Sequence, residues 1–275
     1  MTGWEERGEG PLRWWIPQPW SAWPDLVAVC STRRGGFSQG PYAQLNVGWV
    51  PGDDPGNVVA NRRLLVEALA LPPGTVFAAV QVHGSRTAVA PFPALPARQW
   101  PERVVTYLGE ADVLVAPGPG VFLFATFADC VPVLLVEPRR RAAALAHAGW
   151  RGTAARAAAE AVRALCAAAG CSPADVQAAL GPAIGACCYR VGQEVAEAVA
   201  AVLPHPREAV RPLPGGWAML DLVEANRQQL VEAGVPPQSI AVAGACTACR
   251  SHEFYSHRAA GGRTGRFAAV VGWRK

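Results

Sequence analysis

The stretch from Asp129 to Gly152 constrains the fold most, because it contains two apolar runs on either side of a short turn. The first run covers residues 131–136 and the second covers residues 142–146. Two strands joined by so short a connection run antiparallel, so the start of the first lies beside the end of the second. Cys130 precedes the first strand and His147 follows the second run. The sequence therefore predicts a β-hairpin that brings the Cys130 thiol to the His147 imidazole.

His83 is a third candidate for the same place, because it ends another apolar run, residues 76–82, and precedes a glycine. Taken singly, a cysteine or a histidine is more often a core residue than a ligand. Two histidines and a cysteine at strand ends, however, supply three ligands and leave a fourth position open, which is typical of catalytic zinc. Copper accepts the same donor types. The alternative is a metal-free pair, in which a histidine activates the Cys130 thiol as a nucleophile.

Several motifs resemble, in the same order, those of the YfiH family, the laccase-domain proteins regarded as purine nucleoside phosphorylases. The four central motifs are Gln81-Val82-His83-Gly84, Ala128-Asp129-Cys130-Val131-Pro132-Val133, His147-Ala148-Gly149-Trp150-Arg151-Gly152 and Gly181-Pro182-Ala183-Ile184-Gly185. The likeness extends to residues 32–38, 45–46, 254–256 and 264–266. It implies mixed β-sheets in a layered α/β/β/α arrangement, with the site at strand ends.

The resemblance also implies an activity. Phosphate would cleave adenosine, inosine or methylthioadenosine to the base and the (methylthio)ribose 1-phosphate, with an adenosine deaminase side activity. The metal would be Zn²⁺, with Cu²⁺ as the second candidate, on His83, Cys130 and His147. Asp129 would be a further catalytic residue that orients a ligand or carries a proton. The implied substrate-binding residues are Arg33, Asn46, Gln81, Arg151, Arg258 and Arg266.

Three other functions fit parts of the sequence. One is a metal-free Cys–His hydrolase or deamidase, in which Cys130 attacks and His147 or His83 is the base. Another is a copper-dependent polyphenol oxidase, although five histidines in the whole chain are few for a laccase. A non-enzymatic binding module fits least, because reactive side chains converge. Chelation would separate the first function, which would keep its activity, from the metal enzymes.

Alternating strands and amphipathic helices predict an α/β protein, and the central hairpin predicts mixed rather than purely parallel sheets. We expect a single catalytic domain over residues 25–275, preceded by a Trp- and Pro-rich arm over residues 1–24 whose indoles pack on the body. One helix is expected to start near Asp54-Pro55, and an alanine-rich one to span residues 152–169. Further helices are expected at 192–202 and 221–233, and further strands at 26–30, 112–116, 121–126, 176–180, 217–220, 240–243 and 267–272.

Composition narrows the partners. The net charge of +4 is too small to indicate nucleic acid, and no apolar run reaches the roughly 18–20 residues of a membrane span. Residues 1–10 lack the apolar core of a signal peptide. We therefore expect a cytoplasmic protein with reduced thiols that acts on small molecules, as a monomer or small homo-oligomer. Residues 91–101, with four prolines, predict a surface loop.

Cys246 and Cys249 form a CxxC motif, which is typical of redox or zinc sites. The sequence contains no second CxxC motif and no histidine pair at the distance from the CxxC that a zinc finger requires, although His252 and His257 follow, so a structural zinc site is only the minor interpretation. The neighbouring Cys187 and Cys188 are interpreted as incidental.

Overall fold

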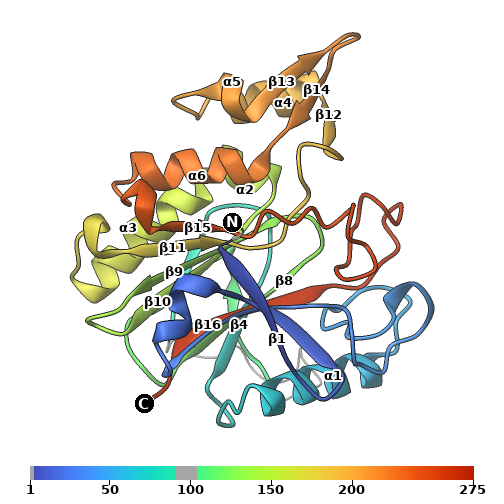
Figure 1. Ribbon diagram of the computed structural model, residues 1–275, viewed down its shortest axis with the longest axis vertical. Coiled ribbons are helices and arrows are strands. Elements are labelled where there is room, and N and C mark those ends of the chain that lie inside the picture. Colours follow the sequence, from blue (N-terminus) through green and yellow to red (C-terminus); the bar gives the residue numbers. More distant parts are fainter. Residues whose placement is uncertain (1–2, 91–103) are drawn as a thin grey trace.

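Two large β-sheets lie face to face at the centre of the molecule (Figure 1). The computed structural model describes residues 3–90 and 104–275, so the loop expected at 91–101 lies outside the described residues. Across the first sheet, the strands are β1 (Trp4–Glu9), β2 (Leu12–Pro17), β3 (Leu26–Ser31), β16 (Phe267–Trp273), β8 (Phe122–Phe127), β4 (Val76–Val80) and β6 (Thr106–Glu110). Across the second, they are β15 (Ile240–Val242), β11 (Gln177–Leu180), β9 (Val131–Glu137), β10 (Ala142–Ala148), β7 (Val113–Ala116) and β5 (Thr87–Val89). Both sheets mix parallel and antiparallel neighbours, which confirms the predicted α/β class with mixed sheets.

Helices cover the outer faces of both sheets, and a small lobe projects from one end (Figure 1). The helices are α1 (Pro55–Ala68), α2 (Trp150–Ala154), α3 (Ala157–Ala169), α4 (Gln193–Ala200), α5 (Pro206–Ala209) and α6 (Leu222–Glu232). The lobe combines α4 and α5 with the antiparallel sheet of β12 (Arg190–Gly192), β14 (Trp217–Leu220) and β13 (Val210–Leu213). The expected helix start is confirmed, because the Asp54 carboxylate accepts a hydrogen bond from the Gly56 amide and caps α1.

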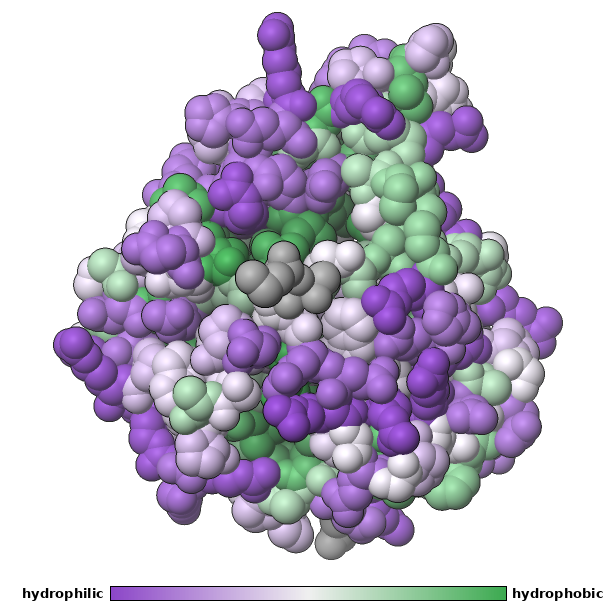
Figure 2. All heavy atoms as spheres, in the orientation of Figure 1, coloured by the Kyte–Doolittle hydropathy of each residue, from purple (hydrophilic) through white to green (hydrophobic). Residues whose placement is uncertain are grey.

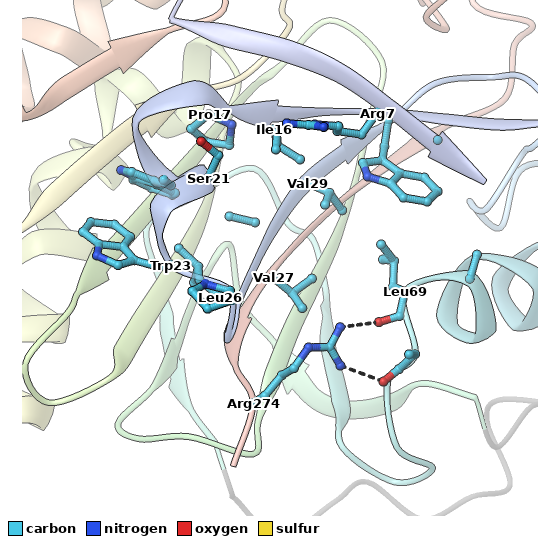
Figure 3. A pocket seen from close by; sticks show the side chains of 17 residues that line it. Arg7, Ile16, Pro17, Ser21, Trp23, Leu26, Val27, Val29, Leu69 and Arg274 are labelled. Carbon is cyan, nitrogen blue, oxygen red and sulfur yellow. Dashed lines mark hydrogen bonds between the residues drawn. The ribbon is translucent and has the colours of Figure 1, made fainter.

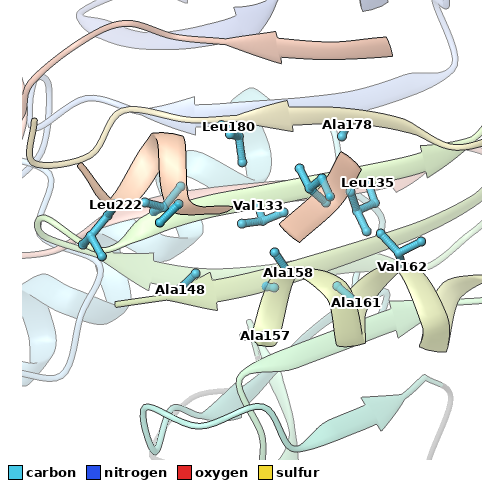
Figure 4. Packing of buried hydrophobic residues seen from close by; sticks show 14 of the residues in the cluster. Val133, Leu135, Ala148, Ala157, Ala158, Ala161, Val162, Ala178, Leu180 and Leu222 are labelled. Atoms are coloured by element: carbon cyan, nitrogen blue, oxygen red, sulfur yellow. The ribbon is translucent and has the colours of Figure 1, made fainter. Parts of the chain in front are cut away.

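The alternation of side chains along β9 explains the layers. Leu134 and Val136 pack between the two sheets, whereas Val133 and Leu135 face α3 and α6 (Figure 4). A third core lies between α1 and the far face of the seven-stranded sheet. All side chains of β9 are therefore buried, which is why residues 131–136 are continuously apolar rather than alternating. The α/β/β/α arrangement is confirmed.

The expected hairpin is also confirmed. β9 and β10 pair antiparallel, with Val131 opposite Ala148 and Pro132 opposite His147. Because Cys130 directly precedes Val131, this register places the thiol beside the end of β10.

The expected continuous helix at 152–169 is wrong. Arg156 adopts a left-handed conformation with φ of 60° and divides the segment into α2 and α3. Its guanidinium donates to the Val202 carbonyl and to the Glu232 carboxylate, contacts that stabilise the break from outside the helix. Alanine-rich helix propensity predicts continuity, and distant contacts override it here.

The N-terminal segment forms strands that the sequence analysis did not predict. β1 and β2 form a hairpin, and β2 pairs with β3, so the hairpin extends the seven-stranded sheet. The indoles of Trp4, Trp15 and Trp20 are buried. The division of the chain into an arm and a domain at residue 25 remains a prediction.

Hydrophilic residues cover much of the face of the molecule drawn in Figure 2, and green, more hydrophobic residues lie below the projecting lobe. Among the residues that the structure describes, the large hydrophobic side chains that are exposed are Phe37, Val82 and Trp217. None of the described helices combines the length and apolarity needed to cross a membrane.

Candidate active site

His83, Cys130 and His147 meet as predicted. Each offers a nitrogen or sulfur ligand atom, and these atoms all lie within 4.8 Å of one another. The two imidazole rings are nearly perpendicular, with centroids 5.0 Å apart. His83 lies in the turn after β4, and its φ of 61° turns the chain sharply there. His147 is buried within β10, whereas His83 is exposed, so the group opens toward solvent on one side.

Asp112 holds the two histidines in place, a role that the sequence did not predict. One carboxylate oxygen lies 2.9 Å from His147 Nδ1, and the carboxylate also accepts hydrogen bonds from the amides of Val82, His83 and Gly84. A carboxylate on the second ring nitrogen fixes the tautomer and leaves the other nitrogen for a ligand. The only sequence signal for Asp112 is an acidic residue at the start of an apolar strand.

Asp112 rather than Asp129 contacts a histidine ring, so the orienting role expected for Asp129 stays a prediction without a hydrogen bond to support it. The Asp129 carboxylate oxygens accept hydrogen bonds from the Thr247 hydroxyl and the Arg258 amide, each at 2.7 Å. These contacts join Asp129 to the C-terminal loop rather than to either histidine ring. A direct catalytic part for Asp129, which lines the cavity described below, remains a prediction.

Cys130 and His147 perturb each other. Burial by itself would raise the pKa of the Cys130 thiol, but the charge and hydrogen bonds of His147, assisted by His83, lower it to about 6. Burial likewise opposes the charged form of His147, but Cys130 and Asp112 raise the pKa of His147 to about 9. Without a metal, the pair therefore favours a thiolate beside an imidazolium at neutral pH.

Gly149 allows the thiol its position. A β-carbon on Gly149 would lie 2.7 Å from Cys130 Sγ and 3.8 Å from His83 Cδ2. The φ of Gly149 is −77°, which any residue can adopt. Glycine is required here for space rather than for backbone conformation.

A cavity of about 600 Å³ adjoins the three residues. Its wall contains four of the six expected substrate-binding residues, namely Gln81, Arg151, Arg258 and Arg266. The aromatic side chains of Trp49, Trp150 and Tyr189 line it as well. Three arginines against a single carboxylate, that of Asp129, make the lining cationic, which suits an anionic substrate.

Arg33 and Asn46 do not line this cavity. The Arg33 guanidinium donates to the carbonyls of Ala43 and Ser251 and lies over the ring of Tyr255. The Asn46 amide oxygen accepts from the Arg266 backbone amide at 2.7 Å, so Asn46 positions the segment that carries Arg266. Arg33 and Asn46 thus lie apart from the four expected residues that line the cavity, and the structure does not support direct substrate binding by Arg33 or Asn46.

The remaining lining residues are positioned by identifiable contacts. The Gln81 amide group exchanges hydrogen bonds with the backbone and hydroxyl of Thr126 on β8. The Arg258 guanidinium lies over the Tyr189 ring, and burial raises the pKa of Tyr189 to about 12. The phenol is consequently protonated at neutral pH and can donate a hydrogen bond.

The donor set fits a metal ion. The two imidazoles and the thiolate have their ligand atoms within 4.8 Å of one another. This set matches zinc sites that have three protein ligands and leave a fourth position for substrate. The Asp112–His147 hydrogen bond is the outer contact that such sites commonly have. Copper accepts the same donors, so the donor set alone does not choose between the two metals.

A second cavity, of about 500 Å³, lies beside the N-terminal hairpin and the end of α1 (Figure 3). Its wall includes apolar side chains such as Ile16, Trp23 and Leu26, and its ionisable residues are Arg7 and Arg274. Arg274 already donates to the carbonyls of Leu69 and Ala70 (Figure 3). Among the described residues, the wall of this cavity contains no cysteine, histidine or acid, so it offers no base to activate the Ser21 hydroxyl.

The interpretation of Cys187 and Cys188 as incidental is also corrected. The structure brings both thiols to the CxxC motif of Cys246 and Cys249, where the four sulfur atoms lie within 4.8 Å of one another. A CxxC motif in a zinc site commonly has a second CxxC as its partner, so the sequence alone did not predict a vicinal pair in that place.

Comparison with known proteins shows the family of the chain. The family model for multi-copper polyphenol oxidoreductase laccase matches residues 27–274. The purine nucleoside phosphorylase YlmD of Geobacillus stearothermophilus is 41% identical over 251 residues, covering 90% of each chain. A purine nucleoside phosphorylase of Pseudomonas aeruginosa is 36% identical over 94% of this chain and 97% of its own.

Solved structures give the same answer. The crystal structure of Geobacillus stearothermophilus YlmD superposes with a TM-score of 0.89 at 37% identity, over 100% of both chains. Bacillus licheniformis YfiH superposes with a TM-score of 0.87 at 33% identity, over 98% of this chain and 99% of its own.

Proposed function

Because the chain belongs to the YfiH family of laccase-domain proteins, we propose that it is a purine nucleoside phosphorylase. Its substrates would be adenosine, inosine and methylthioadenosine, with adenosine deamination as a side activity. The observation that carries this proposal is that His83, Cys130 and His147 line the same cavity as three arginines. Its volume of about 600 Å³ lies within the usual range of small-molecule sites, roughly 300–1,000 Å³.

The arginines would bind phosphate. Arg151, Arg258 and Arg266 reach the cavity from two separate segments of the chain, so they can surround an anion. Guanidinium groups bind phosphate oxygens in pairs, which orients the ion as well as holding it. A phosphate held against C1′ of the nucleoside attacks that carbon while the bond to the purine nitrogen breaks.

Other side chains would bind the base and the leaving group. Trp49 and Trp150 offer flat apolar surfaces to the purine and exclude water. The protonated Tyr189 hydroxyl can donate a hydrogen bond to a purine nitrogen as negative charge develops on it. Gln81 has its amide fixed on Thr126, so it contributes a rigid wall.

Zinc is the metal that we propose for His83, Cys130 and His147, and when bound it would supply the Lewis-acid chemistry that deamination needs. Asp112 keeps the His147 ring in the orientation that ligation requires. Gly149 leaves room for the Cys130 sulfur.

One observation favours a second candidate, the metal-free Cys–His hydrolase. The pKa of Cys130 is lowered to about 6 beside His147, which is how a nucleophilic cysteine is activated. A hydrolase of this kind has no need of His83, although that histidine is held by the same carboxylate. Iodoacetamide labelling separates the two: a zinc ligand is labelled slowly until the metal is chelated, and a nucleophile is labelled quickly in either state.

The direct test is product analysis with inosine, in the presence and absence of phosphate. The proposal predicts that hypoxanthine and ribose 1-phosphate appear only with phosphate. Release of hypoxanthine without phosphate would show a hydrolase instead. Adenosine incubated without phosphate should give inosine, because deamination consumes only water.

A further inference from the structure

A second set of metal-type ligands lies outside the cavity. Cys187 and Cys188 follow β11, and Cys246 and Cys249 follow β15. β11 and β15 are parallel neighbours, so their carboxyl ends leave the sheet at the same edge, and the two loops run side by side (Figure 1). Cys249 Sγ lies 3.6 Å from Cys187 Sγ and 3.4 Å from Cys188 Sγ. Four free thiols thereby meet from segments about 60 residues apart.

The spacing of the sulfur atoms suits a tetrahedral ion. A zinc–sulfur bond of about 2.3 Å places the four sulfur ligands about 3.8 Å from one another. The Cys249 sulfur lies 3.6 and 3.4 Å from the sulfur atoms of Cys187 and Cys188, within a few tenths of an ångström of this value, and no two of the four sulfur atoms lie more than 4.8 Å apart.

The backbone is arranged to hold thiolates. The Gly185 amide donates to Cys246 Sγ at 3.2 Å, and the Cys249 amide is directed at the same sulfur. The two loops are joined by the Ala183–Cys246 bridge and by the Thr247 amide donating to the Ala183 carbonyl. Amide donors to a sulfur stabilise its ionised form, which is the form that binds metal.

We propose that Cys187, Cys188, Cys246 and Cys249 bind a structural zinc ion. Four sulfur ligands close the coordination sphere and leave no position for substrate, which distinguishes this site from the one at His83, Cys130 and His147. The proposal does not depend on the nature of the metal at that other site.

The ion would fasten two walls of the catalytic cavity together. Tyr189 directly follows Cys188, and Arg258 lies over its ring and donates to the Arg190 carbonyl. On the other loop, Thr247 lies between the two cysteines and donates to Asp129. A metal that joins the loops therefore fixes residues of the cavity without touching the substrate.

Elemental analysis of the full-length protein, grown with added zinc, tests the proposal. Wild-type protein should carry about two zinc ions per chain. The single variant Cys130→Ala should carry about one, and so should the double variant Cys187→Ser/Cys249→Ser. A matched control is Cys166→Ser/Cys171→Ser, which also removes two thiols that touch each other, at 3.4 Å, but belong to neither set. It should keep both ions.

X-ray absorption at the zinc edge gives a readout that does not require the cysteine variant to fold. In Cys130→Ala, the remaining zinc should show only sulfur neighbours, at about 2.3 Å, with no nitrogen shell at about 2.0 Å. Zinc-free Cys130→Ala protein, iron in place of zinc, or disulfides among the four cysteines on mass spectrometry would each overturn the proposal.

The same measurements keep the two proposals apart. If wild-type protein held one zinc that Cys130→Ala retained, the four-cysteine site would stand and zinc at the catalytic cavity would fail. If Cys130→Ala held none while wild type held one, the four-cysteine site would fail and the proposed function would be untouched.

Discussion

The three-residue group at the cavity and the four-cysteine group beside it each place their ligand atoms within 4.8 Å, but they are built differently. His83, Cys130 and His147 lie at strand ends and are held by strand pairing and by Asp112. The four cysteines come from two loops and are held by backbone amides. The first set has three ligands, two nitrogen atoms and one sulfur atom, and it opens on a cavity. The second has four sulfur ligands, which fill a tetrahedral coordination sphere. The number and kind of donors, more than their proximity, separate a reactive site from a structural one.

Removal of a ligand from each group should break the comparison most sharply. Cys130→Ala should lower adenosine deamination by more than about 100-fold, because loss of even an outer contact of a metal ligand costs about 10–100-fold. Cys249→Ser should lower the melting temperature but reduce turnover far less. Steady-state rates and thermal denaturation measure both. Equal losses of turnover in the two variants would contradict the division of roles.

Asp112→Asn tests the support of the three-residue group. The substitution removes the charge opposite His147 and one of the acceptors for the backbone of residues 82–84, so metal affinity should fall about 10–100-fold. Titration with a competing chelator measures this. Glu160→Gln is the control. It breaks the ion pair between Glu160 and the exposed Arg163 on α3, and it should leave the metal affinity unchanged.

The same variant should lose stability in a pH-dependent way. Burial opposes ionisation of Asp112, but hydrogen bonds from His147 and the backbone outweigh it and lower the pKa of Asp112. A lowered pKa stabilises the fold above the unfolded value of about 3.9, and this stabilisation is lost as the pH falls through the folded value. The difference in free energy of unfolding between the metal-free forms of wild type and Asp112→Asn should therefore narrow below pH of about 4. A difference that widened in acid would contradict the assignment.

Gly149→Ala should displace the Cys130 sulfur. The new β-carbon would lie 2.7 Å from that sulfur, which must move by about 1 Å, and the rate of adenosine deamination should fall about tenfold. Gly192→Ala is the matched control, because Gly192 also precedes a helix, has a φ of −73° and has open space around its β-carbon position. An equal loss in both variants would point to the helix start rather than to the sulfur.

The smallest effect is expected from Arg266→Lys. Lysine keeps the charge but loses the paired guanidinium donors, so the KM for phosphate should rise about fivefold while the KM for inosine changes little. Arg33→Lys should leave the KM for phosphate unchanged, because Arg33 is bound to two carbonyls and does not line the cavity. If the KM for phosphate rose more in Arg33→Lys than in Arg266→Lys, Arg33 would be the substrate-binding residue that the family resemblance implied.

The sequence by itself determined the central hairpin and therefore the meeting of Cys130 and His147. Both strands are strongly apolar and are joined by a short turn, so their pairing and register follow from local chemistry. The sequence also predicted the place of His83, because an apolar strand precedes this residue and a glycine follows it. The motifs around these residues also identified the family, which the comparisons confirm.

Only the tertiary structure decided which side chains support the site and which stay away from it. Asp112 reaches His147 because β7 pairs with β10, and Arg33 faces carbonyls because its loop packs against the C-terminal segment. The left-handed Arg156 likewise depends on contacts with distant residues. Pairing between distant strands is a property of the whole core, which periodicity within one segment does not encode.

The four cysteines show the same limit most clearly. The vicinal pair and the CxxC motif are both visible in the sequence, but each is only half of a ligand set. They meet because β11 and β15 lie side by side and parallel, although about 60 residues separate them in the chain. Which strands become neighbours in a buried sheet is settled by packing among all the layers, because their continuously apolar sequences carry little information on partner choice.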